Sequence, residues 1–191
     1  MGRRYEENSH DGVPLAIADE HQSNPERIIT LACEISELSI AVAMTQLMTF
    51  AQQDSTRPIR MIINTYGGAV DEMFALYDMM KLIKCPIYTI GLGKIMSAGV
   101  LLLCAGEKGH RMIGSHARVM LHPITSFIRG NVFQAANEAT ELQRLQTQLE
   151  ACLQAETSMT KKSIHTLMAR GNDTYMTPHE AIKHGIVDSM V

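Results

Sequence analysis

The chain has few aromatic residues: it contains no Trp, five Tyr and four Phe, against fourteen Met, in 191 residues. Apolar residues still make up 46% of the chain and charged residues 19%, which excludes a disordered chain of low hydrophobicity and high charge. We therefore expect a core of aliphatic side chains and methionine. The length suits a single domain.

The chain also lacks an excess of either charge sign, since 17 Lys and Arg against 20 Asp and Glu give a formal net charge of −3. This balance offers no basic footprint for nucleic acid. The longest strongly apolar run, Val100–Ala105, is far shorter than the ~20 residues of a membrane helix. The polar start at Met1–Glu7 has no apolar stretch of the kind found in secretory signals. We therefore expect a cytoplasmic protein that binds neither membrane nor nucleic acid.

Sequence motifs for metals and cofactors are missing as well. The four cysteines are widely spaced and mostly have apolar neighbours: Cys33, Cys85, Cys104 and Cys152. They indicate reduced, packed thiols rather than a disulfide framework or a zinc site. A dinucleotide fingerprint starting at Gly91 fails because its third glycine would fall at Met96, and no Walker sequence occurs. No metal and no cofactor are expected.

From Ile28 onward, short apolar runs alternate with stretches of helical periodicity. The runs predict strands over Ile28–Ala32, Ile59–Asn64 and Pro86–Leu92, and the periodic stretches predict helices over 38–51, 70–81 and Ser97–Ala105. This alternation is typical of repeated βαβ units, hence of an α/β fold with a mostly parallel sheet. Two more short strands are expected at Arg111–Ile113 and Arg118–Leu121.

Residues 1–25 are polar and interrupted by Gly and Pro, so we interpret them as a flexible N-terminal arm that precedes one domain at 26–191. Asn131–Met159 contains no Gly or Pro and predicts an unusually long helix. Such a helix either packs along the domain edge or projects to meet a partner subunit. Further helices are expected from Thr160 to about Gly171 and over Thr177–Gly185, the latter opened by a capping box, before a closing strand at Ile186–Val187.

Three segments carry residues suited to catalysis. Asn64–Val70 places a glycine pair between a strand and a helix, which suits either a tight turn or the binding of a negative oxygen. Gly93–Gly99 places Ser97 at a helix start, where a serine is either a helix cap or a nucleophile. His122 ends a strand, where it is either structural or a base. Strand ends of an α/β sheet converge on one edge, so these segments are expected to lie together.

Taken in order, the segments resemble the proteolytic subunit of the Clp protease over about Glu26 to Val191. The motifs that carry the resemblance are Ile62–Gly68, Met96–Gly99, Ala105–Gly109, Arg118–His122 and Glu180–Ser189. The resemblance implies a ClpP/crotonase-like fold of repeated βαβ units with a long projecting handle helix. It also implies a serine endopeptidase that forms a homo-oligomer of two stacked seven-membered rings. Unfolded polypeptides would be threaded into this chamber by a ring-shaped ATPase, and only that partner would use ATP.

The resemblance assigns a role to each matching residue. Ser97 corresponds to the nucleophile, His122 to the general base and Asp173 to the carboxylate that orients the histidine. Gly68 and Ala98 correspond to the two backbone donors of the oxyanion hole. From the residues alone, Asp173 is equally an ordinary turn residue, and Asp188 is the competing acid, although it matches a family position that is not catalytic.

Some positions depart from the family pattern. Thr65-Tyr66 stands where the family has Ser-Pro, Met96 is bulky, Pro123 directly follows the histidine, and Asp19–Pro25 is polar where the family has an amphipathic helix that helps to dock the ATPase. Two alternatives therefore stay open. One is a non-catalytic or regulatory paralogue in mixed rings. The other is an acyl-CoA hydratase or isomerase of the crotonase type, which uses Glu or Asp at the cleft instead of a Ser–His pair.

Overall fold

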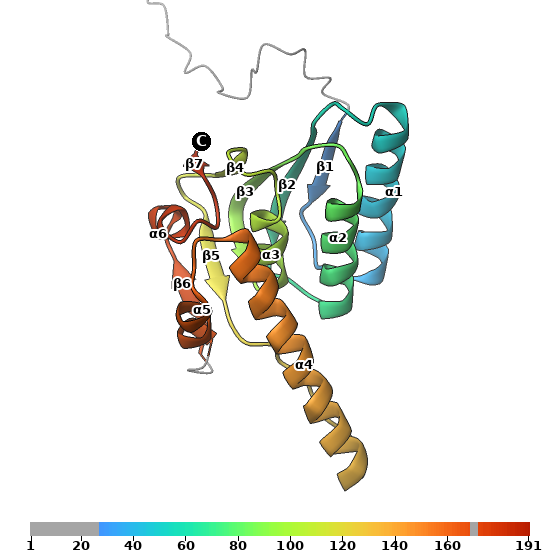
Figure 1. Cartoon of the computed structure of the whole chain (residues 1–191), viewed down its shortest axis with the longest axis vertical. Helices are drawn as coiled ribbons and strands as arrows, with labels where there is room; N and C mark the ends of the chain where they lie inside the picture. Colours follow the sequence, from blue (N-terminus) through green and yellow to red (C-terminus); the bar gives the residue numbers. More distant parts are fainter. Residues whose placement is uncertain (1–26, 169–171) are drawn as a thin grey trace, which may run out of the picture.

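Residues 27–168 and 172–191 of the computed structural model are described here, and they begin as three consecutive strand–helix units (Figure 1). The predicted arm at 1–25 and the end predicted near Gly171 lie outside the described residues. The elements are β1 (Ile28–Leu31), α1 (Glu37–Gln53), β2 (Ile59–Thr65), α2 (Val70–Leu82), β3 (Ile87–Met96), α3 (Ala98–Cys104), β4 (Arg111–Ile113), β5 (Arg118–Leu121), α4 (Val132–Glu156), α5 (Lys161–Met168), β6 (Thr174–Met176), α6 (Pro178–Lys183) and β7 (Ser189–Met190).

The strands form one sheet in the order β1-β2-β3-β4-β7, with parallel pairing throughout this path. β5 pairs in parallel with the second half of β3, and β6 pairs antiparallel with β5. The first half of β3 therefore meets β4 and its second half meets β5. The predicted α/β fold with a mostly parallel sheet and repeated βαβ units is confirmed.

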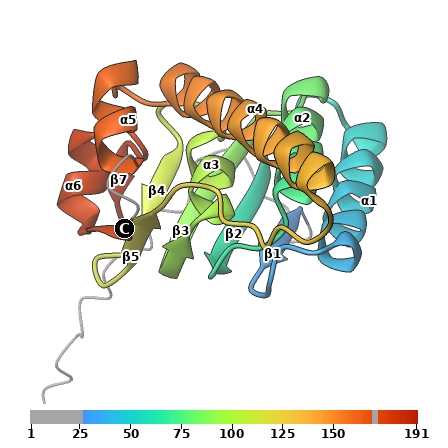
Figure 2. The same cartoon turned by 90° about the horizontal axis from the view of Figure 1, so that it is seen from below.

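One face of the sheet carries the core. Along β2 the buried and half-buried side chains alternate strictly, with Ile59, Met61 and Ile63 turned inward. α1, α2 and α3 lie on that side of the sheet, and the C-terminal part of α4 packs against α3 (Figure 2). The seven residues of α3 are all buried, as expected for a helix that is apolar on every side. The predicted aliphatic core holds, since Phe74 is the only aromatic among the buried hydrophobic residues described.

Helix α4 projects well beyond the domain (Figure 1). It has 25 residues, and its buried positions all lie in its last two and a half turns, at Leu149, Glu150, Leu153 and Glu156. Its N-terminal end is exposed, and Val132 and Phe133 are each 81% accessible there. Of the two interpretations of this segment, the projecting handle is therefore correct for most of its length. None of the described helices combines the length and apolarity that crossing a membrane requires.

The structure corrects four sequence-based expectations. β3 does not end at Leu92 but continues to Met96, because its glycines are accommodated where the strand changes partner from β4 to β5. β6 had not been predicted. The closing strand is Ser189–Met190 rather than Ile186–Val187, whose side chains are buried without joining the sheet. Cys33 is exposed rather than packed, although all four cysteines are free thiols.

Candidate active site

Ser97 occupies the turn between β3 and α3. It is the one described residue other than glycine with a positive φ, at 54° with ψ −124°. Such a conformation costs about 1–3 kcal/mol and persists only where the surroundings enforce it. Here the Ser97 N–H donates to the Met120 carbonyl at 2.8 Å, and Val100 N–H donates to the Ser97 carbonyl at 3.0 Å. Its hydroxyl makes no capping bond to α3, so the helix-cap interpretation is wrong.

The Ser97 hydroxyl instead meets His122 at the end of β5. The Ser97 Oγ and His122 Nε2 atoms lie 2.7 Å apart, which is a hydrogen bond in which the hydroxyl donates when Nε2 is unprotonated. The register of β3 with β5 brings them together, because Met96 pairs with Met120, one residue before Ser97 and two residues before His122. A serine hydroxyl bonded to an imidazole in this way has the geometry that a nucleophile and its base require.

The glycine pair after β2 lies against the same turn. Gly67 has φ 102°, and a Cβ added to it would stand 2.7 Å from Ser97 Cβ and 3.2 Å from the Ala98 nitrogen. Gly68 has φ 153°, and a Cβ there would stand 2.1 Å from the Ile35 carbonyl oxygen. Only glycine fits at both positions. The same glycine pair therefore forms the tight turn and allows its close approach to Ser97.

Two residues that the sequence did not identify hold this turn in place. The buried Thr65 hydroxyl donates to the Cys33 carbonyl at 2.5 Å and accepts the Gly67 N–H at 3.0 Å. Ile35 donates to the Gly67 carbonyl at 2.9 Å and accepts the Ala69 N–H at 2.8 Å. Among the turn and loop hydrogen bonds of the described residues, none uses the N–H groups of Gly68 or Ala98. Gly68, Ser97 and Ala98 all line the same pocket.

A small pocket of about 50 Å³, the nucleophile pocket, opens beside Ser97 and His122. Its wall is mainly apolar, with Val70, Met73, Leu121, Ile124 and Leu149. No Asp or Glu belongs to the described residues that line it. The carboxylate chemistry of a crotonase-type hydratase or isomerase therefore has no group to perform it here. Likewise, no three His, Cys, Asp or Glu side chains gather to hold a metal within the described ranges.

Asp173 directly precedes β6, the strand that pairs with β5, and His122 directly follows β5. The Asp173 side chain is exposed and accepts a hydrogen bond from the Tyr175 hydroxyl at 3.3 Å, and no bond joins it to His122 in the described part of the chain. The antiparallel register of β5 and β6 nevertheless pairs Leu121 with Thr174. His122 and Asp173 are the next residues beyond that last pair. The Asp173 carboxylate itself bonds to Tyr175.

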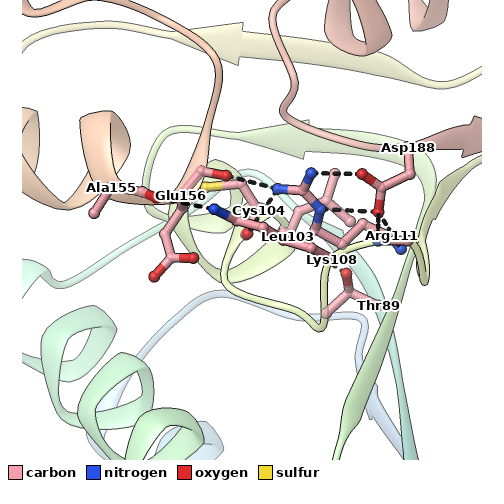
Figure 3. Close-up of polar contacts among 9 residues, drawn as sticks. Thr89, Leu103, Cys104, Lys108, Arg111, Ala155, Glu156 and Asp188 are labelled. Atoms are coloured by element: carbon pink, nitrogen blue, oxygen red, sulfur yellow. Dashed lines mark hydrogen bonds and ion pairs between the residues drawn. The ribbon is translucent and has the colours of Figure 1, made fainter.

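The competing acid, Asp188, is fully engaged in the Arg111 cluster, which consists of Arg111, Asp188 and Glu156 (Figure 3). The Asp188 carboxylate accepts Arg111 Nε at 3.0 Å and Nη2 at 2.5 Å, together with the backbone N–H of Gly109 and of Arg111. Partial burial acts to raise the pKa of Asp188, but the bonds and charge of Arg111 outweigh it and leave this pKa lowered. Asp188 is therefore excluded as a partner of His122.

The same cluster anchors the root of α4. Arg111 Nη1 donates to the Glu156 carbonyl at 2.7 Å and to the Cys104 carbonyl at 3.2 Å. The Glu156 carboxylate accepts the Tyr77 hydroxyl at 2.8 Å and pairs with Lys81 at 2.7 Å. Burial, together with the Glu156 bond, raises the pKa of Tyr77. The cluster thus joins α2, α3, β4 and α4, and its role is structural.

Comparison with known proteins identifies the family to which this arrangement belongs. The family model described as Clp protease matches residues 17–191. The chain is 35% identical over 166 residues to ATP-dependent Clp protease proteolytic subunit 4 of Rhodococcus jostii (strain RHA1), covering 87% of this chain and 84% of that protein. It is 33% identical over 166 residues to the ATP-dependent Clp protease proteolytic subunit of Deinococcus radiodurans, covering 87% and 80%. Subunit 1 of Rhodococcus jostii is 34% identical over 177 residues, covering 89% and 80%.

Proposed function

Because this chain belongs to the Clp protease family and is a serine peptidase, we propose that it is an endopeptidase subunit acting through Ser97, His122 and Asp173. The observation that carries the proposal is the 2.7 Å contact between Ser97 Oγ and His122 Nε2 at a strained nucleophile turn. Unfolded polypeptide is the proposed substrate. A non-catalytic role in mixed rings is disfavoured, because the nucleophile, the base and both backbone donors are present.

The proposed reaction begins when His122 takes the Ser97 proton as the hydroxyl attacks a peptide carbonyl carbon. The oxygen of the tetrahedral intermediate then accepts the N–H groups of Gly68 and Ala98, a stabilisation worth ~2.7–4 kcal/mol for each donor. His122 returns the proton to the leaving amine, and the C–N bond breaks. Water, deprotonated by the same histidine, then releases the acyl group from Ser97.

The apolar nucleophile pocket supports binding of an apolar substrate side chain next to the scissile bond. Asp173 supports His122 in this proposal by accepting its Nδ1–H, which fixes the tautomer and stabilises the imidazolium. This requires the carboxylate to leave Tyr175 and turn toward the neighbouring strand. The pairing of Leu121 with Thr174 supports this movement, since His122 and Asp173 are the next residues beyond that pair.

Labelling with a fluorophosphonate probe tests the proposal directly. The assembled wild-type chain at neutral pH is expected to take one label per subunit. Ser97→Ala is expected to take none, and His122→Ala to label far more slowly because the hydroxyl loses its base. Absence of label on the assembled wild type would overturn the hydrolase proposal, and unchanged labelling of His122→Ala would remove histidine from its role.

We further propose that the working unit is a homo-oligomer of two stacked seven-membered rings. The projecting part of α4 and its exposed apolar end support a contact between rings. On one face of the parallel sheet, side chains such as Arg60 and Ile62 are half-buried, although Ile90 on the same face is buried. Parallel sheets are normally covered on both faces, so a neighbouring subunit is the natural cover. Light scattering should show a large assembly, and a stable monomer near 21.2 kDa would contradict this arrangement.

A chamber of this kind needs a partner that delivers unfolded chains, and a ring-shaped ATPase of the Clp type is the proposed one. The names of the relatives support this proposal, since each contains the words ATP-dependent Clp protease. ATP would be consumed by that partner and no cofactor by this chain. Degradation of a folded protein that starts only when ATPase and ATP are added is the expected result.

A further inference from the structure

A second and larger pocket adjoins the nucleophile pocket across the glycine turn. It measures about 450 Å³ and is formed where β1 and β2 end, beside β3. Gly68 lines both pockets. The side chains around the second pocket are mostly polar or aromatic, and they include Asn64, Tyr66 and Lys94. Tyr66 is the residue that replaces the proline of the family pattern, so this pocket has a wall particular to this chain.

Lys94 is held in a defined place at this pocket. Its Nζ donates to Asn64 Oδ1 at 3.0 Å and lies 4.6 Å from the centroid of the Tyr66 ring. An ammonium group has three donors, so the Asn64 bond leaves two unused. Within the described ranges, Lys94 forms no ion pair with a carboxylate. Glu34 also lines the pocket, but its exposed carboxylate is not paired with Lys94.

The strand register brings a second cation beside Lys94. Lys94 of β3 pairs with Arg118 of β5, so the two side chains lie on the same face of the sheet. Arg118 is exposed, and the described part of the chain gives it no carboxylate partner. Two neighbouring positive charges favour an anion from solvent more than one does.

This face continues to the catalytic pair. Side chains alternate along a strand, so Arg118, Met120 and His122 share one face of β5. Lys94 is three residues before Ser97, which at ~3.3 Å per residue is roughly 10 Å. His122 protonates the leaving amine, so the leaving segment of a substrate starts above His122. An extended peptide that runs from there along β5 reaches Lys94 and Arg118 within about two to four residues.

From these contacts we propose that Lys94, supported by Tyr66 and Asn64 and assisted by Arg118, forms a carboxylate subsite for the leaving segment of the substrate. The inference rests on the proposed peptidase function and adds a specificity to it. The carboxylate comes either from an acidic side chain two to four residues after the scissile bond or from the C-terminus of a short peptide. Both sources present the same group to Lys94.

Matched peptides test the subsite on the assembled full-length chain. All peptides share one apolar acyl half, and their four-residue leaving halves carry Glu or Gln at the third position, each with a free or an amidated C-terminus. We expect kcat/KM to favour Glu over Gln, or free acid over amide, by about fivefold, which corresponds to one solvent-accessible ion pair. The preference should weaken as salt rises.

Variants assign the effect to the residue. Lys94→Gln is expected to reduce the ratio to within about twofold of unity, Lys94→Glu to reverse it, and Arg118→Gln to lower it partially. Lys84→Gln is the matched control, because Lys84 is an exposed lysine at the end of α2 and lines a different pocket. It should leave the ratio unchanged.

The possible outcomes distinguish the carboxylate subsite from the proposed peptidase function. A ratio near one in the wild type, or a ratio that survives Lys94→Gln, overturns the subsite while Ser97-dependent cleavage of the amidated Gln peptide still supports the peptidase. No Ser97-dependent cleavage of any peptide overturns the peptidase. A Lys94-dependent preference only for the free acid supports the subsite and identifies the chain end as the source.

Discussion

The Arg111 cluster and the Ser97 site are both polar arrangements in an aliphatic protein, but they differ in how far their groups are satisfied. The guanidinium of Arg111 meets a carboxylate and two carbonyls, and the Asp188 carboxylate accepts four hydrogen bonds. At the other site, Ser97 holds a strained backbone. Among the described residues, the N–H groups of Gly68 and Ala98 have no turn or loop hydrogen bond, and His122 bonds through Nε2 alone. The first arrangement stabilises the fold, whereas the second keeps its groups available for a substrate.

The largest expected effect concerns Asp173, the proposed partner of His122. Asp173→Asn is expected to reduce kcat for peptide cleavage by on the order of 10⁴-fold, because an amide cannot hold His122 in the required tautomer. Thermal stability should hardly change, since the Asp173 side chain is exposed. Steady-state peptide hydrolysis measures the effect. Tyr175→Phe is the control: it removes only the bond that holds Asp173 away from His122, so loss of activity in Tyr175→Phe and not in Asp173→Asn would reject the assignment.

The Arg111 cluster should respond in the opposite way. Asp188→Asn leaves the buried Arg111 without its counter-charge and is expected to cost about 3 kcal/mol of unfolding free energy. Urea denaturation measures this change. The folded variant should still react with a fluorophosphonate at close to the wild-type rate, because Asp188 does not contact His122. A folded Asp188→Asn variant with wild-type stability but no fluorophosphonate labelling of Ser97 would contradict the roles given to the two sites.

A smaller effect is expected from the strained turn itself. Ser97→Gly and Ser97→Ala both remove the nucleophile, but only glycine relieves the positive φ of 54°. Ser97→Gly should therefore be more stable than Ser97→Ala by about 1 kcal/mol, observed as a higher Tm in thermal denaturation. Equal melting temperatures would mean that the Ser97 turn carries no strain. The Ser97 site would then not differ from the Arg111 cluster in backbone strain.

The smallest effect is on acid stability. The lowered pKa of Asp188 means that the folded chain binds this proton less readily than the unfolded chain. The stabilisation is therefore present above the ordinary aspartate value of 3.8 and is lost as pH falls below it, through the folded pKa. The difference in unfolding free energy between wild type and Asp188→Asn should therefore shrink as pH falls below about 3.8. A difference that stays constant with pH would assign the cluster to packing rather than charge.

The sequence predicted the strands and helices best where periodicity is strong, from β1 to α3 and in α4. It missed β6 because three residues after Asp173 carry too little pattern, and it placed the last strand at Ile186–Val187 because apolar residues fit a buried loop as well as a strand. Ser189 and Met190 form the last strand instead, because they pair with Met112 and Ile113 of β4.

For the site, local motifs identified Ser97, His122 and the glycine pair. The support from Thr65 could not be predicted, since its hydroxyl bonds to the Cys33 carbonyl, 32 residues away in sequence. The same limit applies to the contact of Gly67 with Ser97. Contacts of this kind depend on how distant strands align in the sheet. A single sequence does not show that alignment, except through resemblance to a known family.

Helix α4 is anchored at one end and projects at the other. It is fixed at its C-terminal end by Leu149, Leu153 and the Arg111 cluster, and the 17 residues before Leu149 extend for roughly 25 Å without a buried side chain. A tilt of roughly 5° at the root would carry the far end about 2 Å sideways by simple leverage over that length. A conservative change in the packing of Leu153 would thus displace Phe133 far more than it displaces Ser97. In the proposed stacked rings, the contact through α4 would therefore be lost before catalysis.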